Sequence, residues 1–180
     1  MKSICLAVVL MLVQTVAWAE TATDESEPTV RDMDNQRLQE LIERVADDIE
    51  GRPGYWQFDL EGFQTIVITD EDADRMRIIV PVATMEEVDS DRLHRIMQAN
   101  FDSALDARYS IAKGVLWSAF IHPLAALSDH QFVDGLAQTV NLAATYGTTY
   151  SSGALVFSQG DSQGEQNKLY KEIIERENSI

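Results

Sequence analysis

Between residues 35 and 146, the spacing of apolar residues changes from a helical period to short strand-like runs and back again. The first apolar set recurs on one face of a 3.6-residue period, at Leu38, Leu41, Ile42, Val45 and Ile49. This spacing predicts a helix that Asp34 or Asn35 caps and that Gly51 and Pro53 end.

Three strand-like segments follow this helix. Residues 55–58 are rich in aromatic side chains, residues 63–69 in Ile, Val and Thr, and residues 76–82 are again apolar. The acidic run 70–74 marks a turn, and Pro81 indicates a strand end or an edge strand. The three segments predict a three-stranded antiparallel meander.

A second helix and a strand pair come next. Asp89 is a typical N-cap, and the helix after it has one face made of Leu93, Ile96, Met97, Asn100, Phe101, Ala104 and Leu105. Residues 107–112 and 115–121 then have strand composition. Lys113-Gly114 between them is a tight-turn signal, so the pair predicts a hairpin.

A capping box, with Ser128 followed three residues later by Gln131, predicts the start of a third helix. The inward side of this helix carries Phe132, Val133, Leu136, Val140 and Ala143. Gly147 is placed to end it with a positive φ. Residues 158–167 are rich in Ser, Gly and Gln and indicate a loop, and residues 169–174 a short helix.

The order is therefore helix, three-stranded antiparallel meander, helix, two-stranded hairpin, helix. Because strands and helices fall into separate runs, the order predicts an α+β fold with helices packed on one twisted antiparallel sheet. The far face of that sheet is either covered or solvated. We expect Trp56, Trp117 and Phe120 to lie there as an apolar patch, because such patches often mark partner interfaces.

The first residues have the pattern of a secretory signal peptide. Lys2 gives a positive start, residues 4–13 are apolar, and Ala-Trp-Ala at 17–19 is a small-x-small cleavage site. The apolar run is shorter than the roughly 20 residues of a membrane-spanning helix, although an uncleaved anchor is the alternative. We expect cleavage near Ala19 and a periplasmic or secreted protein.

The cysteine count agrees with this interpretation. Cys5 is the only cysteine and lies in the predicted signal peptide, so the mature chain would have no disulfide and no thiol ligand. The sequence thus predicts four parts, namely a signal peptide (1–19), a flexible acidic linker (20–34), a single α+β domain (35–157) and a polar C-terminal tail (158–180).

The charge balance restricts the partners. The chain has 14 Lys and Arg against 30 Asp and Glu, a net charge of −16, whereas its 45% hydrophobic content is enough for a folded core. An acidic surface repels phosphate, so we expect neither nucleic acid nor an anionic membrane surface as a partner.

The basic residues that remain gather in mid-chain, at Arg75, Arg77, Arg92, Arg95 and Arg108. Two interpretations are open for this cluster. The arginines could form internal ion pairs with nearby acids, namely Asp70, Asp74, Asp102 and Asp106. Alternatively, they could form a docking patch for an acidic segment of a partner.

No pattern of residues indicates catalysis. Asp70, Asp72 and Asp74 alternate as in the start of an EF-hand loop, but Arg75 and Pro81 stand where that loop needs Gly and Glu. A solvated hairpin turn and a weak Ca²⁺ contact are the two interpretations. The chain also lacks a G-x-S-x-G elbow, a P-loop and a G-x-G-x-x-G motif.

The three histidines, His94, His122 and His130, have no zinc-site spacing. His122 is the candidate for a pocket residue, because the ends of strands often border sites. We expect no cofactor, no metal and no catalytic residue.

The element order α-β-β-β-α-β-β-α resembles the fold of type III secretion chaperones and the Tir-chaperone-like superfamily. Within it, the sequence is similar to the YbjN-type domains of bacteria, described as sensory transduction regulators. The stretches that carry this resemblance are Thr69–Glu71, Arg77–Val82, Leu93–Phe101 and the strand pair with Trp117 and Phe120. The resemblance implies a protein-binding function, often as a homodimer. Secretion chaperones are cytosolic, whereas this chain has an export signal.

The sequence therefore predicts an exported, non-enzymatic protein-binding module of the cell envelope, regulatory or chaperone-like, with homodimers as one form. The residues expected to bind the partner are Trp56, Arg77, Arg95, Trp117 and Phe120. The alternative is a small-molecule-sensing domain or an enzyme whose site lies in the groove between sheet and helices.

Overall fold

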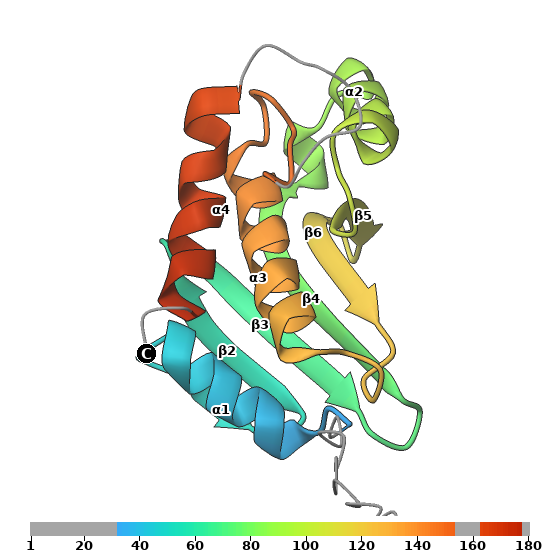
Figure 1. Ribbon diagram of the computed structural model, residues 1–180. Helices are drawn as coiled ribbons and strands as arrows, with labels where there is room; N and C mark the ends of the chain where they lie inside the picture. The colour runs from blue at the N-terminus through green and yellow to red at the C-terminus, as the bar shows by residue number, and fades with distance from the viewer. Residues whose placement is uncertain (1–31, 154–162, 178–180) are drawn as a thin grey trace, which may run out of the picture. The chain divides into compact units, whose positions relative to one another are not determined.

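The computed structural model of the chain describes residues 32–153 and 163–177. The predicted signal peptide and the linker up to residue 31 lie outside this part. The described part has an α+β fold, with helices packed against one antiparallel sheet (Figure 1), which confirms the predicted fold class.

The helices are α1 (Asn35–Val45), α2 (Ser90–Asp102), α3 (Asp129–Ala144) and α4 (Gln163–Glu177), with a short 3₁₀ helix at Met85–Glu87. The strands are β1 (Glu50–Arg52), β2 (Tyr55–Leu60), β3 (Phe63–Asp70), β4 (Arg75–Thr84), β5 (Arg108–Ala112) and β6 (Val115–His122). They form a single sheet in the order β1-β2-β3-β4-β6-β5, in which every neighbouring pair is antiparallel.

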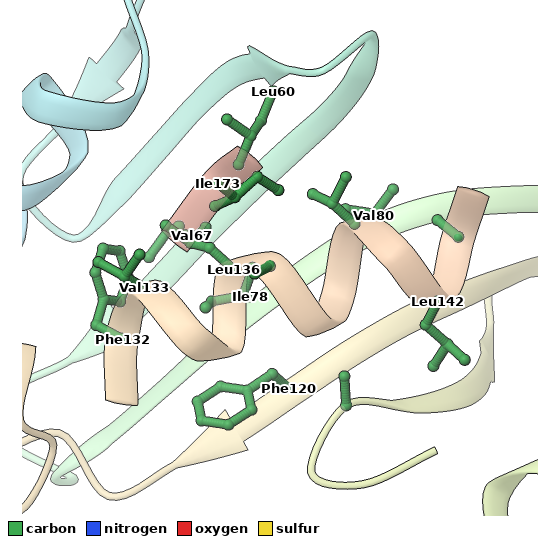
Figure 2. Close-up of a cluster of buried hydrophobic side chains, with 14 of the residues drawn as sticks. Leu60, Val67, Ile78, Val80, Phe120, Phe132, Val133, Leu136, Leu142 and Ile173 are labelled. Carbon is green, nitrogen blue, oxygen red and sulfur yellow. The ribbon is translucent and has the colours of Figure 1, made fainter. Parts of the chain in front are cut away.

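Alternate residues of the strands face three of the helices, and we call this side the covered face. In β4, the buried residues are Met76, Ile78 and Val80. In the register of the sheet, Val67 of β3 and Phe120 of β6 lie directly opposite Ile78, so one buried row crosses the three central strands. The side chains of this row pack against Leu136 and other residues of α3, together with Ile173 of α4 (Figure 2).

Helix α3 forms the centre of the core. Ser128 caps its first turn by accepting a hydrogen bond from the backbone N–H of Gln131, as the capping box predicts. The helix lies very close to β6, because a Cβ atom at Gly135 would be only 2.9 Å from the ring of Phe120. Glycine at this position therefore sets the distance between helix and sheet, and no cavity is left at this contact.

Helix α1 begins as expected, with Asp34 accepting from the backbone N–H of Arg37, but it is shorter than the apolar spacing predicts. It ends at Val45, because Ala46 has an extended backbone. The residues predicted to end the helix instead form β1, an edge strand. A Cβ atom at Gly51 would lie 2.1 Å from the carbonyl oxygen of Tyr55, so the pairing of β1 with β2 requires glycine there.

One ion pair joins α1 to α3 on the covered face. The guanidinium of Arg37 in α1 donates three hydrogen bonds to the carboxylate of Asp129 in α3, of which one measures 3.1 Å from Nε to Oδ1. A further hydrogen bond goes to Glu40 at 2.6 Å. The hydrogen bonds from Arg37 hold the pKa of Asp129 below its usual value. The pair fixes α1 relative to α3.

The C-terminal residues differ from the sequence prediction. A single helix, α4, covers residues that the composition assigns partly to a loop and partly to a short helix. Ile173 is fully buried in the core, and the guanidinium of Arg176 donates to the carbonyl oxygen of Val45 at 3.1 Å. Helix α4 therefore packs with the domain and covers it beside α3 (Figure 1).

Two details of β4 and β5 also depart from expectation. Pro81 does not end its strand, because β4 continues to Thr84 beyond a register shift between Pro81 and Ala83. At the sheet edge, the side-chain amide of Asn100 in α2 accepts from the backbone N–H of Tyr109 at 2.7 Å and donates to its carbonyl at 3.0 Å. Asn100 thus takes both backbone groups that Tyr109 turns toward the edge.

Candidate functional site

The second face of the sheet carries no helix among the described residues, and we call it the open face. Figure 1 shows α1, α3 and α4 together on the other side. In β3, Ile66 and Ile68 point to the open face, whereas Val67 between them is fully buried on the covered face. In β4, Ile79 points to the open face, between the buried Ile78 and Val80. Both central strands therefore carry apolar residues on both sides over their middle positions.

The register of the sheet brings these open-face residues into three rows that cross the strands. The first row contains Tyr55, Ile68, Arg77 and Ile121, the second contains Ile66, Ile79 and Ala119, and the third contains Pro81, Trp117 and Ser110. We call the apolar members of these rows the apolar stripe, namely Tyr55, Ile66, Ile68, Ile79, Pro81, Trp117, Ala119 and Ile121. Tyr55 is 39% exposed and Ile121 is 61% exposed.

Trp117 is the largest side chain of the apolar stripe. Its indole Nε1–H donates to the carbonyl oxygen of Ala112 at 3.1 Å, which satisfies its polar atom within its own hairpin. The ring is therefore held in place without using a group from elsewhere in the fold. A fixed aromatic side chain on an uncovered surface gives a large contact area at a low cost in conformational entropy.

Arginines flank the apolar stripe. Arg52, Arg75, Arg77 and Arg108 occupy open-face positions of β1, β4 and β5. Arg75 donates to the carbonyl oxygen of Asp74, and Arg108 donates to the carbonyl oxygens of Asn100 and Leu105. Arg52 and Arg77 are exposed and make no hydrogen bond or salt bridge within residues 32–153 and 163–177.

The structure bears on one of the two interpretations of the mid-chain arginines, the internal ion pairs. The salt bridges between described residues involve Arg37, Lys168 and Arg176 as cations. None of the five mid-chain arginines pairs with the four acids proposed for them, in the part of the chain that the structure describes. The internal-pairing interpretation is therefore wrong. The charges of Arg77 and Arg52 remain available to a partner.

Two of the residues expected on the far face of the sheet lie in the core instead. Trp56 is 1% exposed, with its indole N–H donating to Gln39 of α1, and Phe120 is 4% exposed against α3. The prediction that they form a surface patch is wrong. Trp117 and Arg77 do both lie on the open face, two rows apart, with the row of Ile79 and Ala119 between them.

Arg95 lies elsewhere, on α2. Its guanidinium carbon is 5.0 Å from the centre of the Tyr150 ring, and that of Arg92 is 5.9 Å from the centre of the Tyr146 ring. These cation–π contacts attach α2 to the loop after α3. They hold Arg95 in a structural contact, away from the apolar stripe.

Helix α2 carries a second exposed apolar surface. Only Ile96 and Ala99 of this helix are buried, whereas Met97 is 58% and Phe101 is 89% exposed. The face predicted for this helix is thus buried at Ile96 and exposed at Met97 and Phe101. Ile111 of β5 is also exposed, at 51%.

The residues considered for chemistry are not brought together. Asp70 and Asp74 accept backbone N–H groups, from Ala73 at 2.9 Å and from Ala125 at 2.7 Å, so they stabilise the turn. The described residues contain no group of three His, Cys, Asp or Glu that could hold a metal ion. No described helix has the length and apolar composition that crossing a membrane requires.

His122 does line a groove, of about 260 Å³, at the end of β6. The other lining residues are mostly polar: Leu105, Asp106, Arg108, Phe120, Ile121, Gln131 and Asp134. Asp134 accepts from Gln138 at 2.7 Å and from the hydroxyl of Tyr170, and burial together with this carboxylate raises the pKa of Tyr170. Gln138 in turn accepts the backbone N–H groups of Asp106 and Ala107. These contacts hold a loop and α4 against α3, so the residues that make them stabilise the fold.

Neither a protein-family model nor a curated protein matches the sequence. Three solved structures are similar to this chain in the course of the backbone. They are the type III secretion chaperone SycH of Yersinia pestis in complex with a fragment of YscM2, the HopA1–SchA chaperone–effector complex, and the ExsC–ExsE complex.

The similarity to the SycH structure has a TM-score of 0.49 at 16% identity, over 63% of this chain and 98% of the other. The similarity to the HopA1–SchA complex has a TM-score of 0.48 at 11% identity, over 62% of this chain and 94% of the other. The similarity to the ExsC–ExsE complex has a TM-score of 0.46 at 15% identity, over 69% of this chain and 95% of the other.

Proposed function

We propose that this chain is an exported, non-enzymatic protein-binding module whose open face holds a partner polypeptide. One observation carries the proposal: the central strands β3 and β4 carry apolar residues on both sides over their middle positions, although described helices cover only one side. Strands with apolar residues at successive positions are typical of sheets that are buried on both faces. An antiparallel sheet with a solvated face normally carries polar residues at every second position instead.

The chemistry of the open face fits a polypeptide ligand. The apolar stripe crosses several strands, so it offers a continuous contact surface rather than an isolated exposed side chain. Its third row contains the fixed Trp117, and aromatic residues are enriched in protein interfaces. Exposed arginines lie at its border, where interfaces are polar.

The proposed export and the proposed regulatory or chaperone-like role are supported by the sequence. The signal-peptide pattern of residues 1–19 supports export, to the periplasm or beyond the cell, and a role in the cell envelope. The similarity of the sequence to YbjN-type domains supports a regulatory or chaperone-like role. A second copy of the chain is one candidate partner, in which case the module is a homodimer.

A small-molecule site in the groove between sheet and helices receives less support. The contact between Gly135 and Phe120 is closed, since even a methyl group would clash there. The groove beside His122 is lined mostly by polar groups, several of which already hold neighbouring segments together. An apolar pocket with a few convergent polar groups, the usual form of such sites, would be expected instead.

Site-specific photo-crosslinking tests the proposed function. Replacing the single cysteine, Cys5, by serine gives a background in which Ser110→Cys places one reactive thiol beside Trp117 on the open face. Lys171→Cys on the exposed side of α4 is the matched control. Each variant carries a benzophenone label, and the products are separated by mass after irradiation in the envelope fraction.

We expect a defined adduct from position 110 that is absent from position 171 and that Ile79→Ser suppresses. Light scattering of the purified chain then shows whether the partner is a second copy. The same adducts from both positions, or adducts that Ile79→Ser leaves unchanged, would show that the open face is not the binding surface.

A further inference from the structure

We infer that the partner segment held by the open face is acidic, with apolar side chains that cover the apolar stripe and carboxylates that pair with Arg52 and Arg77. This inference rests on the proposed function and adds the chemistry of the partner. It is not the expectation from the net charge of −16, which favours a basic partner. The two expectations can therefore be separated by experiment.

The positions of the two arginines carry the inference. Arg52, Tyr55, Ile68, Arg77 and Ile121 follow one another across β1, β2, β3, β4 and β6, each opposite its neighbour in the register. Three strand spacings separate Arg52 from Arg77, which is about 14 Å. Tyr55 and Ile68 fill the space between them. Along the row, a cation is therefore followed by two apolar residues, a second cation and another apolar residue.

Neither arginine is neutralised within the described part of the chain. The nearest open-face carboxylates in the register are Glu50, two residues from Arg52 on β1, and Asp70, which lies opposite Arg75 rather than Arg77; neither forms a salt bridge with Arg52 or Arg77 among the described residues. Ile68 and Ile121 are the direct neighbours of Arg77 across the strands. Arg77 is therefore an exposed cation flanked by apolar side chains, and it lacks a carboxylate in its own row.

The charged residues of the open face are unevenly distributed along the strands. Arg75, Arg77 and Arg52 lie toward the turn between β3 and β4, whereas Asp59 and Glu50 lie farther from it. Repulsion from the rest of the acidic molecule is screened beyond roughly 8 Å at physiological salt. Contacts between a carboxylate and an arginine in an interface that excludes water are screened much less. Once a partner covers the apolar stripe, the attraction between an arginine and a carboxylate of the partner therefore outweighs the repulsion from the net negative charge of the molecule.

Synthetic peptides provide the test. Two 18-residue amphipathic peptides share the same leucine positions, and one has Glu and the other Lys at the positions that flank the leucines. Binding of each peptide to the full chain is measured by fluorescence anisotropy at 0.15 M and 0.5 M salt. The protein variants are Arg77→Glu, Arg52→Glu and, as a control with the same change of charge on α4, Lys171→Glu.

We expect the acidic peptide to bind at least tenfold more tightly than the basic one at 0.15 M salt. Arg77→Glu and Arg52→Glu should each weaken its binding by roughly three- to tenfold, and Lys171→Glu should change it less than twofold. Circular dichroism confirms that the variants fold, since all three positions are exposed.

The outcomes separate the partner chemistry from the proposed function. Equal or tighter binding of the basic peptide, if it is lost in Ile79→Ser, would overturn the acidic preference and leave the open face as the binding surface. Binding that Ile79→Ser does not weaken would contradict the use of the open face itself. If neither peptide binds, the inference is also wrong, because the stripe and its arginines would then lack affinity for the segment they are proposed to hold.

Discussion

The two faces of the sheet are built from similar residues and have different tasks. On the covered face, Val67, Ile78 and Phe120 form a row that is closed by α3. On the open face, Ile66 and Ile79 form a neighbouring row with Ala119, and no described element closes it. One buried face is sufficient for a stable core. The apolar character of the other face is therefore better explained by binding than by folding.

The largest expected effect comes from truncating adjacent isoleucines of β4 that point to opposite faces. Ile78→Ala should lower the free energy of unfolding by about 2–5 kcal/mol, because Ile78 is fully buried and its loss leaves a cavity. Ile79→Ala should lower it by about 1 kcal/mol or less, because its environment is already partly solvent. Urea denaturation measures both values. Equal losses would mean that the open face is covered in the isolated protein.

A second comparison adds volume to each face instead of removing it. Gly135→Ala should cost about 1–3 kcal/mol, since the new methyl group meets the Phe120 ring and pushes α3 away from β6. Ser110→Val adds two methyl groups at an exposed position of the open face, and it should change the free energy of unfolding by less than about 0.5 kcal/mol.

The clash at Gly135 has a specific control. In the background of Phe120→Leu, which removes part of the ring, Gly135→Ala should cost less than it does in the natural chain. A double-mutant cycle from thermal or urea unfolding gives the coupling energy. Strictly additive losses would exclude the contact between residues 120 and 135 as the cause.

The third prediction uses pH and has the smallest effect. Burial raises the pKa of Tyr109, whose hydroxyl donates to the carbonyl oxygen of Leu142 at 2.7 Å. Above about pH 10, this tyrosine loses its proton in the unfolded chain but keeps it in the folded one. The stability that it contributes is thus complete below pH 10 and falls above it, by about 1.4 kcal/mol per pH unit.

The variant Tyr109→Phe isolates this contribution. It should lower stability at pH 7 by about 1 kcal/mol through the lost hydrogen bond, yet show a shallower fall between pH 10 and 11 than the natural chain. Tyr55→Phe, on the open face, is the matched control and should leave the slope as it is. Parallel slopes for the natural chain and Tyr109→Phe would mean that Tyr109 ionises freely in the fold.

Much of the fold follows from local patterns in the sequence. The caps at Asp34, Asp89 and Ser128 each accept the backbone hydrogen bonds expected of them. The tight turn at Lys113-Gly114 has positive φ at both residues, as a two-residue hairpin requires. These signals act within a few residues of the chain, so they do not depend on tertiary packing.

The face to which each strand residue points can be predicted from the sequence by counting positions along the strand, because successive side chains point to opposite faces. Trp117 and Phe120 are an odd number of residues apart in one strand, so they must point to opposite faces. Trp56 and Phe58 share a parity with Leu60, and together they form the apolar side of β2. Counting parity along each strand would have placed Phe120 apart from Trp117 and drawn attention to Ile79.

Other features depend on tertiary contacts and have no local signal. The side chain of Asn100 in α2 pairs with the backbone of Tyr109, which lies nine residues along the chain on another element. Helix α4 begins in a segment rich in Gln and Gly, and the burial of Ile173 together with the hydrogen bond from Tyr170 to Asp134 stabilises it. Free arginines also cannot be recognised from sequence, because acids are close to all of them along the chain.

The side chain of Asn100 has a consequence for the behaviour of many copies together. A sheet with an apolar face is prone to stack and to grow by adding strands from other molecules, the route to fibrils. Asn100 occupies the hydrogen-bonding groups of Tyr109 at one margin of the sheet, and the other margin is a strand of three residues followed by Pro53. Both margins thus limit the backbone groups with which a strand of another molecule could pair, although the sheet exposes an apolar surface.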